Sequence, residues 1–292
     1  MKDTKKHYLE HDIMTEIRAN RHMVADLPRD MKTIVTYVQN ILLHQHWSQA
    51  YGLVLTEERK REPFLRSFEE KLIFLKGRGF THLSEQKSNE NKMIAICRDF
   101  SVVAAALCRE AGIPARARCG FADYFEKGKY IDHWVLEYWN EEKKQWVMVD
   151  AQLDTLQQRA LKLSFDPLNV PENDFITGPR AWLLCRKGCF DPELFGIFKW
   201  WGYDYIRCNL LLDVNSLLGV PLQPWDLWEG YKSLPIEHWT ERDYEAMDAL
   251  SQLALSADED FEALYQYVEK NGKIKVPMDL NMVVNGLENG ED

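Results

Sequence analysis

One helix with a cysteine at its start and a marked stop at its end constrains this chain more than any other feature. Residues 94–121 open with Ile-Ala-Ile-Cys97, continue through strong helix formers and reach Gly112, which Ile-Pro follows. This ending is typical of a left-handed cap and a helix breaker, so the pattern predicts one helix that has Cys97 in its first turn and ends at Gly112, and then a short strand. At about 100° per residue, Cys97 shares a stripe with apolar residues. The charged residues fall on the opposite side: Arg98, Asp99, Arg109 and Glu110.

A cysteine at the first turn of a helix is a candidate nucleophile. The unpaired N–H groups and the positive dipole end stabilise an anion there and lower the pKa of a thiol. A small buried core residue is the alternative interpretation, because free cysteines are often buried. Catalytic partners elsewhere in the chain decide between the two.

Two strands downstream of the helix supply such partners. Residues 130–139 alternate, with His133 on one face and Trp134 on the other. Residues 145–150 place Asp150 on one face with two further side chains, Trp146 and Met148. A carboxylate and an imidazole on neighbouring strands are the groups that activate a thiol: the imidazole accepts the thiol proton and the carboxylate orients the imidazole.

The hairpin between these strands sets which residues face each other. The polar stretch 140–143 predicts a four-residue loop, so that Trp139 faces Lys144 and His133 faces Asp150. Directly opposed side chains on one sheet face have Cβ atoms about 4.5–5.5 Å apart, which is close enough for a hydrogen bond. A register shift of two residues leaves them diagonal neighbours, whereas a shift of one puts them on opposite faces.

These blocks resemble the transglutaminase-like superfamily. The resemblance is carried by Cys97-Arg-Asp-Phe-Ser, Leu107-Cys-Arg-Glu-Ala-Gly-Ile-Pro-Ala-Arg116, Asp132-His-Trp-Val-Leu-Glu-Tyr and Trp146-Val-Met-Val-Asp150. It implies a Cys-His-Asp triad at Cys97, His133 and Asp150, and a papain-like α+β core. Members commonly have glycine before the cysteine and proline after the aspartate, where this chain has Ile96 and Ala151.

We therefore expect an α+β protein with a papain/transglutaminase-like core. The cysteine helix packs on an antiparallel sheet that carries the histidine and the aspartate, and further helices lie at both ends. Residues 1–80 are predicted to be the N-terminal helical part of this core, with two helices in residues 10–46 divided near Pro28 and a third at 64–76. Residues 81–151 form the catalytic core. Residues 152–292 form a mainly helical, aromatic-rich extension packed on it.

Other parts of the site are less sharply defined. The first oxyanion donor is expected to be the backbone N–H of Cys97, and a side chain upstream of it to be the second. Asn91, Gln86 and Trp47 are the alternatives, and Asn91 is our candidate. Among the aromatic residues, Trp134 beside the histidine is the candidate for substrate contact, followed by the pair Trp200-Trp201.

Charge and cysteine usage exclude several classes. With 46 acidic and 36 basic residues, a net charge of −10 and no basic stripe, the chain is not expected to bind nucleic acid. Cys185, Cys189 and Cys208 lack a fourth ligand nearby, so we expect no metal and no cofactor. No apolar run of about 18 residues occurs and the first residues lack an apolar core, so we expect no membrane segment and a cytoplasmic location with thiols rather than disulfides.

The predicted function is cysteine-dependent acyl transfer or amide hydrolysis, by a protease, amidase or transamidase. Cys97 forms a thioester, His133 serves as base and acid, and Asp150 orients His133. The substrate is expected to be a peptide, a protein or a small amide. Two alternatives remain: a catalytically inactive protein that uses the fold for binding or scaffolding, and a cysteine acyltransferase with a thioester donor.

Overall fold

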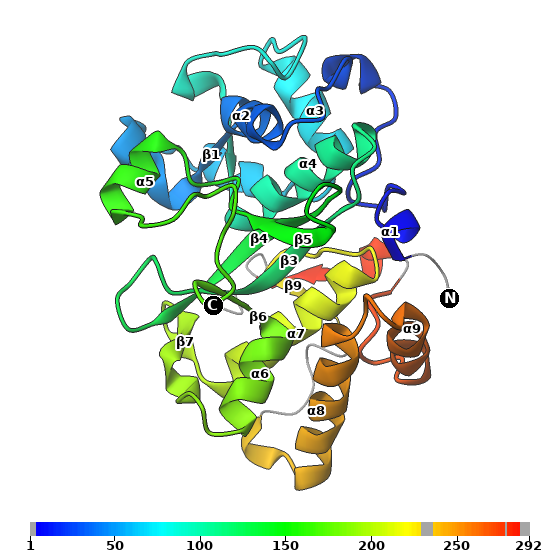
Figure 1. Ribbon diagram of the computed structural model, residues 1–292. Helices are drawn as coiled ribbons and strands as arrows, with labels where there is room; N and C mark the ends of the chain where they lie inside the picture. Colours follow the sequence, from blue (N-terminus) through cyan, green and yellow to red (C-terminus); the bar gives the residue numbers. More distant parts are fainter. Residues whose placement is uncertain (1–3, 229–235, 278, 287–292) are drawn as a thin grey trace. The chain divides into compact units, whose positions relative to one another are not determined.

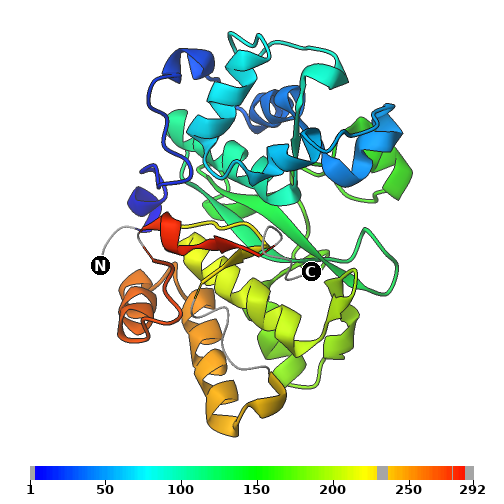
Figure 2. The same ribbon diagram turned by 180° about the vertical axis from the view of Figure 1, so that it is seen from behind.

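The computed structural model describes residues 4–228, 236–277 and 279–286 (Figure 1; the reverse view is Figure 2). It combines helices with strands, as expected of an α+β protein. The chain divides into two compact units. The cysteine unit comprises residues 5–117 and 134–171, and the histidine unit comprises residues 1–4, 118–133 and 172–292. The chain crosses from one unit to the other within strands β3 (Ala115–Ala122) and β4 (Tyr130–Asn140).

Three helices build the core of the cysteine unit: α2 (Met31–Ile41), α3 (Phe68–Gly77) and α4 (Cys97–Glu110). Both α2 and α3 pack on α4, and Figure 1 shows them in neighbouring positions. Each of the first two has a side-chain cap: Asp30 accepts from the N–H of Thr33, and Ser67 forms a reciprocal capping box with Glu70. The apolar side chains between the helices include Ile34, Val38, Leu72, Leu75, Val103 and Leu107.

The N-terminal segment departs from the prediction of two α-helices in residues 10–46. Only the second forms, as α2; residues 10–30 contain the 3-10 helix Arg21–Val24, and α1 (Thr4–His7) lies before them. The Asp12 carboxylate accepts from the N–H groups of Met14 and Thr15 at 2.9 Å. Such local bonds compete with a helix for the same backbone donors, which explains the error. The third predicted helix forms as α3 but begins at Phe68, after the Ser67 cap.

The hairpin of β4 and β5 (Gln145–Val149) forms with a different register from the predicted one. Trp139 pairs with Trp146 instead of Lys144, and Asn140 pairs with Gln145. The loop is therefore residues 141–144. Asn140 causes the shift, because its side-chain oxygen accepts from the N–H groups of Glu142 and Lys143 at 3.1 and 2.9 Å and starts the turn one residue later. The change of register is two residues, so each side chain keeps its predicted face.

Smaller elements complete the cysteine unit. The short strands β1 (Leu42–His44) and β2 (Met93–Ala95) pair in parallel, and β2 directly precedes α4 in the chain. The 3-10 helices Gln45–Tyr51, Arg59–Phe64 and Asn89–Asn91 lie in the connections. Helix α5 (Thr155–Leu161) follows β5, with the Asp154 side chain as its cap.

In the histidine unit, short strands flank the ends of β3 and β4. Strand β6 (Phe175–Thr177) pairs with the end of β3, β7 (Phe195–Ile197) pairs in parallel with the start of β4, and β8 (Trp200–Trp201) pairs with β7. Helices α6 (Gly178–Arg186), α7 (Tyr203–Leu217) and α8 (Glu241–Leu255) pack on one another. The remaining elements are α9 (Phe261–Lys270), β9 (Asp226–Leu227), β10 (Val284–Asn285) and the 3-10 helices Pro192–Leu194, Ile236–His238 and Leu280–Met282.

A buried ion pair joins α7 to β3 within the histidine unit. Arg118 donates through Nε and Nη2 to the two carboxylate oxygens of Asp213, at 2.9 and 2.8 Å. Asp213 also accepts from the N–H of Cys119 at 2.8 Å. This bidentate contact fixes α7 against the end of β3. No helix in the described part of the chain is long and apolar enough to cross a membrane.

Candidate functional site

Cys97 is the first residue of α4, as predicted, and its side chain is buried, with the residue 8% exposed. The preceding Ile96 has extended backbone angles, φ −113° and ψ 169°, which any residue adopts. The glycine common in this position among transglutaminase-like proteins is therefore not needed here for the backbone to reach the helix. The start of α4 places the positive end of the helix dipole at the thiol.

A buried ionic cluster lies directly behind the cysteine. The Asp99 carboxylate accepts from the backbone N–H of Ile96 at 3.1 Å, and it pairs with Lys71 at 2.9 Å and with Arg98 at 3.1 Å. All three charged side chains are 0% exposed. Burial lowers the pKa of Lys71, and the neighbouring Asp99 carboxylate opposes that change. Asp99 was predicted on the face of the helix opposite the core, whereas the structure buries α4 on both faces.

The cluster ties the start of α4 to the start of α3. Lys71 donates to the carbonyl of Leu65, and Arg98 donates to the carbonyl of Arg66 at 2.6 Å. These carbonyls belong to the segment just before the Ser67 cap. The backbone at Cys97 is therefore held by groups from two helices.

A second buried carboxylate fixes the strand that leads to the cysteine. Glu62, 5% exposed, accepts from the backbone N–H of Ile94 at 2.6 Å. Its other oxygen pairs with Arg59 at 2.9 Å and with Arg78 at 3.1 Å. Two carboxylates thus accept alternate N–H groups, of residues 94 and 96, on the approach to Cys97.

Asp150 follows directly after β5 in the same unit and is fully buried. Its backbone N–H donates to the carbonyl of Pro167 at 2.8 Å, and its Oδ1 accepts from the N–H of Gln152 at 3.0 Å. The carboxylate is therefore anchored on one oxygen by the backbone of its own turn.

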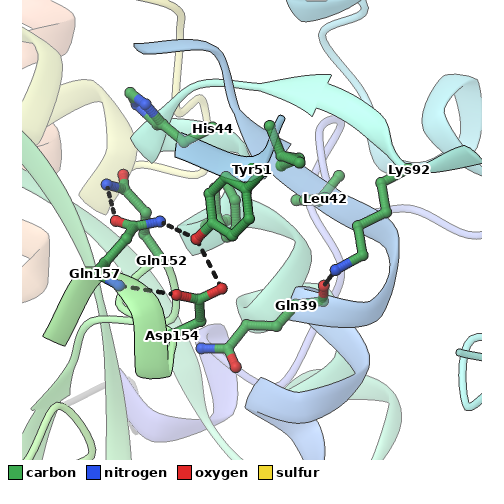
Figure 3. A pocket seen from close by; sticks show the side chains of 10 residues that line it. Gln39, Leu42, His44, Tyr51, Lys92, Gln152, Asp154 and Gln157 are labelled. Atoms are coloured by element: carbon green, nitrogen blue, oxygen red, sulfur yellow. Dashed lines mark hydrogen bonds between the residues drawn. The ribbon is translucent and has the colours of Figure 1, made fainter. Parts of the chain in front are cut away.

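A small polar cavity adjoins this turn (Figure 3). Gln152 donates to Gln157, Gln157 donates to the Tyr51 hydroxyl, and Tyr51 donates to Asp154, over 3.0, 3.1 and 2.7 Å. Lys92 approaches from the other side and donates to the carbonyl of Gln39 at 2.8 Å. Burial raises the pKa of Tyr51, helped by Asp154, and lowers the pKa of Lys92. With a volume of about 10 Å³, the cavity has room for one water molecule.

His133 belongs to the histidine unit, near the start of β4, and is 2% exposed. Three aromatic rings of that unit surround the imidazole: Phe125, Tyr124 and Phe175, at centroid distances of 4.8, 6.0 and 6.5 Å. An imidazole within such rings is restrained in its orientation. Cys97 and Asp150 lie in the cysteine unit, so the three predicted catalytic residues are distributed over both units.

Asp132, the neighbour of His133, is a buried acid that sequence reasoning did not single out. Asn209 of α7 donates to its carboxylate at 2.7 Å and to the carbonyl of Gly120 at 3.0 Å. Burial raises the pKa of Asp132, although Asn209 and His133 both favour its ionised form. These contacts hold the backbone beside the histidine to α7.

We expect the free energy of unfolding of the Asp132→Asn variant to increase relative to that of the parent protein as the pH rises. Because the pKa of Asp132 is raised on folding, the native state loses stability from about pH 4, where the unfolded carboxyl ionises, until the folded pKa is passed. Asparagine does not ionise, and its oxygen can still accept from Asn209. Urea unfolding of both proteins between pH 4 and pH 7 measures the change. A stability difference independent of pH would contradict the burial of an ionising group.

The remaining predicted site residues lie as follows. Trp134 is 1% exposed, and its buried indole N–H has no hydrogen-bond partner among the residues that the structure describes, so its ring belongs to the interior. Asn91 is half-buried and donates to the Ser88 hydroxyl at 3.0 Å, within its own turn. His44 lies at the end of β1, caps the following 3-10 helix and pairs with Ala95, two positions before Cys97.

The His44 imidazole accepts from the N–H of His46 through Nδ1 at 3.3 Å, which leaves Nε2 to carry the proton of a neutral ring. Within the described residues, no group of three or more His, Cys, Asp or Glu side chains is placed to hold a metal ion. All six cysteines lie in the described ranges, and none is in a disulfide bond.

Residues 77–151 match the family model of the transglutaminase-like superfamily. This segment is about a quarter of the chain, contains Cys97, His133 and Asp150, and confirms the resemblance carried by the four sequence blocks. Comparisons with curated proteins and with solved structures gave no match.

Proposed function

We propose that this protein is a cysteine-dependent enzyme of acyl transfer or amide hydrolysis, with Cys97 as nucleophile, His133 as base and acid, and Asp150 as the carboxylate that orients His133. The observation that carries the proposal is the position of Cys97 as the first residue of α4, inside the segment that matches the transglutaminase-like superfamily. Proteins of this superfamily share a papain-like core, so we propose that arrangement for the triad here.

The hairpin register supports the pairing of His133 with Asp150. Glu137 pairs with Met148 and Trp139 with Trp146, so these four side chains share a face. His133 lies four residues before Glu137 and Asp150 two residues after Met148, which assigns both to that face by the period of two along a strand. We propose that the imidazole and the carboxylate act from this shared face of the hairpin.

The proposed reaction proceeds in two halves. The Cys97 sulfur attacks the carbonyl carbon while its proton passes to His133, and the C–N bond breaks as His133 returns that proton to the leaving amine. Water or a second amine then attacks the thioester carbon and gives a proton to His133. The C–S bond breaks, and His133 returns that proton to the sulfur, which restores the thiol and the neutral imidazole. The substrate class that we propose is a peptide, a protein or a small amide.

Thiol labelling tests the proposal before any substrate is known. Burial raises the pKa of both Cys108 and Cys185 to about 12, so neither is expected to react with iodoacetamide near neutral pH. Exposed Cys189 is a reference for an ordinary thiol. At pH 6, Cys97 is expected to label at least about tenfold faster than Cys189, and His133→Ala is expected to remove this advantage. Labelling of Cys97 at the rate of Cys189 or below would instead favour a binding protein with no turnover.

A further inference from the structure

An exposed aromatic hairpin in the histidine unit carries a strained backbone. Strands β7 and β8 pair Ile197 with Trp200, which leaves Phe198 and Lys199 as a two-residue loop. Phe198 has φ +53°, in the left-handed region, and is 65% exposed. Two-residue hairpin loops usually place glycine, asparagine or aspartate at such angles. A bulky residue there is an outlier of a kind that clusters at functional sites.

The hairpin is built to hold this shape. A Cβ atom on Gly196 would lie 2.1 Å from the carbonyl oxygen of Trp200, so the two strands approach closely because Gly196 has no side chain. The indole N–H of Trp201 donates to the carbonyl of Phe198 at 2.8 Å. The tip therefore presents its rings in a fixed arrangement, which lowers the entropic cost of binding.

The hairpin pairs with the strand that carries His133. Strands β4 and β7 are parallel, with Tyr130 opposite Phe195 and Ile131 opposite Gly196. The last paired residue of β4, Ile131, is two residues before His133, and the loop residue Phe198 is two residues after Gly196. Since the hairpin and the histidine belong to the same unit, this relation depends on that unit alone.

The exposed rings occur together with lysines. Trp200 is 40% exposed, and Lys199 lies over its ring at 4.9 Å. Lys129, which also pairs with Glu126 at 2.8 Å, lies over the ring of Trp201 at 4.8 Å. In a chain of net charge −10, this tip combines apolar rings with ammonium groups. Rings favour apolar side chains, and ammonium groups favour carboxylates.

We infer that the tip formed by Phe198, Lys199 and Trp200 is a substrate-binding lip beside His133, and that it selects polypeptides with apolar side chains next to acidic ones. The inference rests on the proposed function, because it assigns the occupant as the acyl substrate. Phe198 and Trp200 contact the apolar side chains, and Lys199 contacts an acidic one. In binding of this kind, a few large aromatic side chains contribute most of the binding free energy.

Direct binding to the full chain tests this inference. The Cys97→Ala variant removes turnover, and the probe is a fluorescein-labelled peptide in which Phe and Leu alternate with Glu around one Gln, followed by fluorescence anisotropy. We expect Phe198→Gly and Trp200→Ala each to weaken binding about tenfold, and Lys199→Glu to weaken it most at low salt. Tyr265→Ala is the matched control, since Tyr265 is also 40% exposed but lies on α9, and it is expected to leave the affinity unchanged.

The Phe198→Gly variant separates binding from folding. Glycine adopts a positive φ without cost, so its melting temperature is expected to equal or exceed that of the parent protein while its affinity falls. Equal affinities in the parent and in Phe198→Gly would overturn the inference. So would equal binding of a peptide with Lys in place of Glu, selective binding to phosphatidylserine vesicles, or self-association that Phe198→Gly abolishes.

The binding measurement uses the Cys97→Ala protein, which has no thiol at this position. Failure of the peptide to bind would therefore overturn the inference about the lip, while the proposed thiol chemistry is tested separately by labelling. An unreactive Cys97 with specific peptide binding would instead refute the enzyme and retain the lip as a peptide-binding surface.

Discussion

Asp99→Ala is expected to lower the free energy of unfolding by about 3–5 kcal/mol, the usual cost of removing one partner from a buried ionic cluster. The change leaves Lys71 and Arg98 as buried cations without their shared carboxylate, and it leaves the N–H of Ile96 without its acceptor. Urea unfolding at neutral pH, followed by far-UV circular dichroism, measures the loss. The start of α4 is the part of the fold most affected, so labelling of Cys97 is expected to lose its advantage over Cys189 as well.

Two further variants serve as comparisons for the stability loss expected of Asp99→Ala. Glu57→Ala breaks an exposed ion pair with Lys60 and is expected to leave the free energy of unfolding almost unchanged, because solvent screens such pairs. Lys71→Met replaces one buried cation by an apolar side chain and leaves the contact of Asp99 with Arg98, so its cost is expected to be smaller than that of Asp99→Ala. If Asp99→Ala were as mild as Glu57→Ala, the cluster would not stabilise the start of the helix.

The elements that could be predicted are those whose signals are local. The end of α4 follows from Gly112, which has φ +73° one residue after the Ala111 cap, and from the proline that comes two residues later. Helix α8 likewise begins after Thr240, which forms a capping box with Asp243, and α9 begins after Asp260, which accepts from the N–H of Ala263. In each case a few adjacent residues decide the conformation, so that the sequence alone is informative.

The ionic cluster behind Cys97 could not be predicted, because its members come from distant parts of the chain. A helical projection assigns Asp99 to the polar face, and a lysine in the middle of α3 is ordinarily read as a surface residue. Only the packing of α3 on α4 brings Lys71 to Asp99. One local signal was present. An acid at the third position of a helix, here Asp99, can accept the N–H of the residue that precedes the helix, here Ile96.

The hairpin illustrates a limit of a different kind. The alternation of residues 130–139 and 145–150 was sufficient to assign faces, but the register depended on where the turn begins. Asn140 moved that point by accepting two backbone N–H groups, and no pattern of apolar residues reports such a bond. Faces follow from periodicity, whereas register follows from the geometry of one turn.

Asp150→Asn is expected to reduce acyl transfer by about 10³–10⁴-fold while leaving the fold intact. The asparagine oxygen can still accept from the N–H of Gln152, so the turn after β5 keeps its anchor. The side chain loses the charge that stabilises a protonated His133, and its amide group favours the wrong tautomer of the imidazole. Acylation of Cys97 by p-nitrophenyl acetate, followed as release of p-nitrophenol, measures the effect without knowledge of the natural substrate.

Asp154→Asn is the matched control for this experiment. Asp154 lies four residues further along, accepts from the Tyr51 hydroxyl at 2.7 Å and caps α5, so its replacement tests a nearby carboxylate that has no proposed part in catalysis. We expect its acylation rate to stay within a few-fold of the parent and its stability to change little, because asparagine caps a helix about as well as aspartate. Equal losses of rate in the two variants would show that any change in this turn impairs the site. A loss confined to Asp150→Asn, with unchanged melting, would assign the orienting role to that carboxylate, because only its charge and proton preference would have changed.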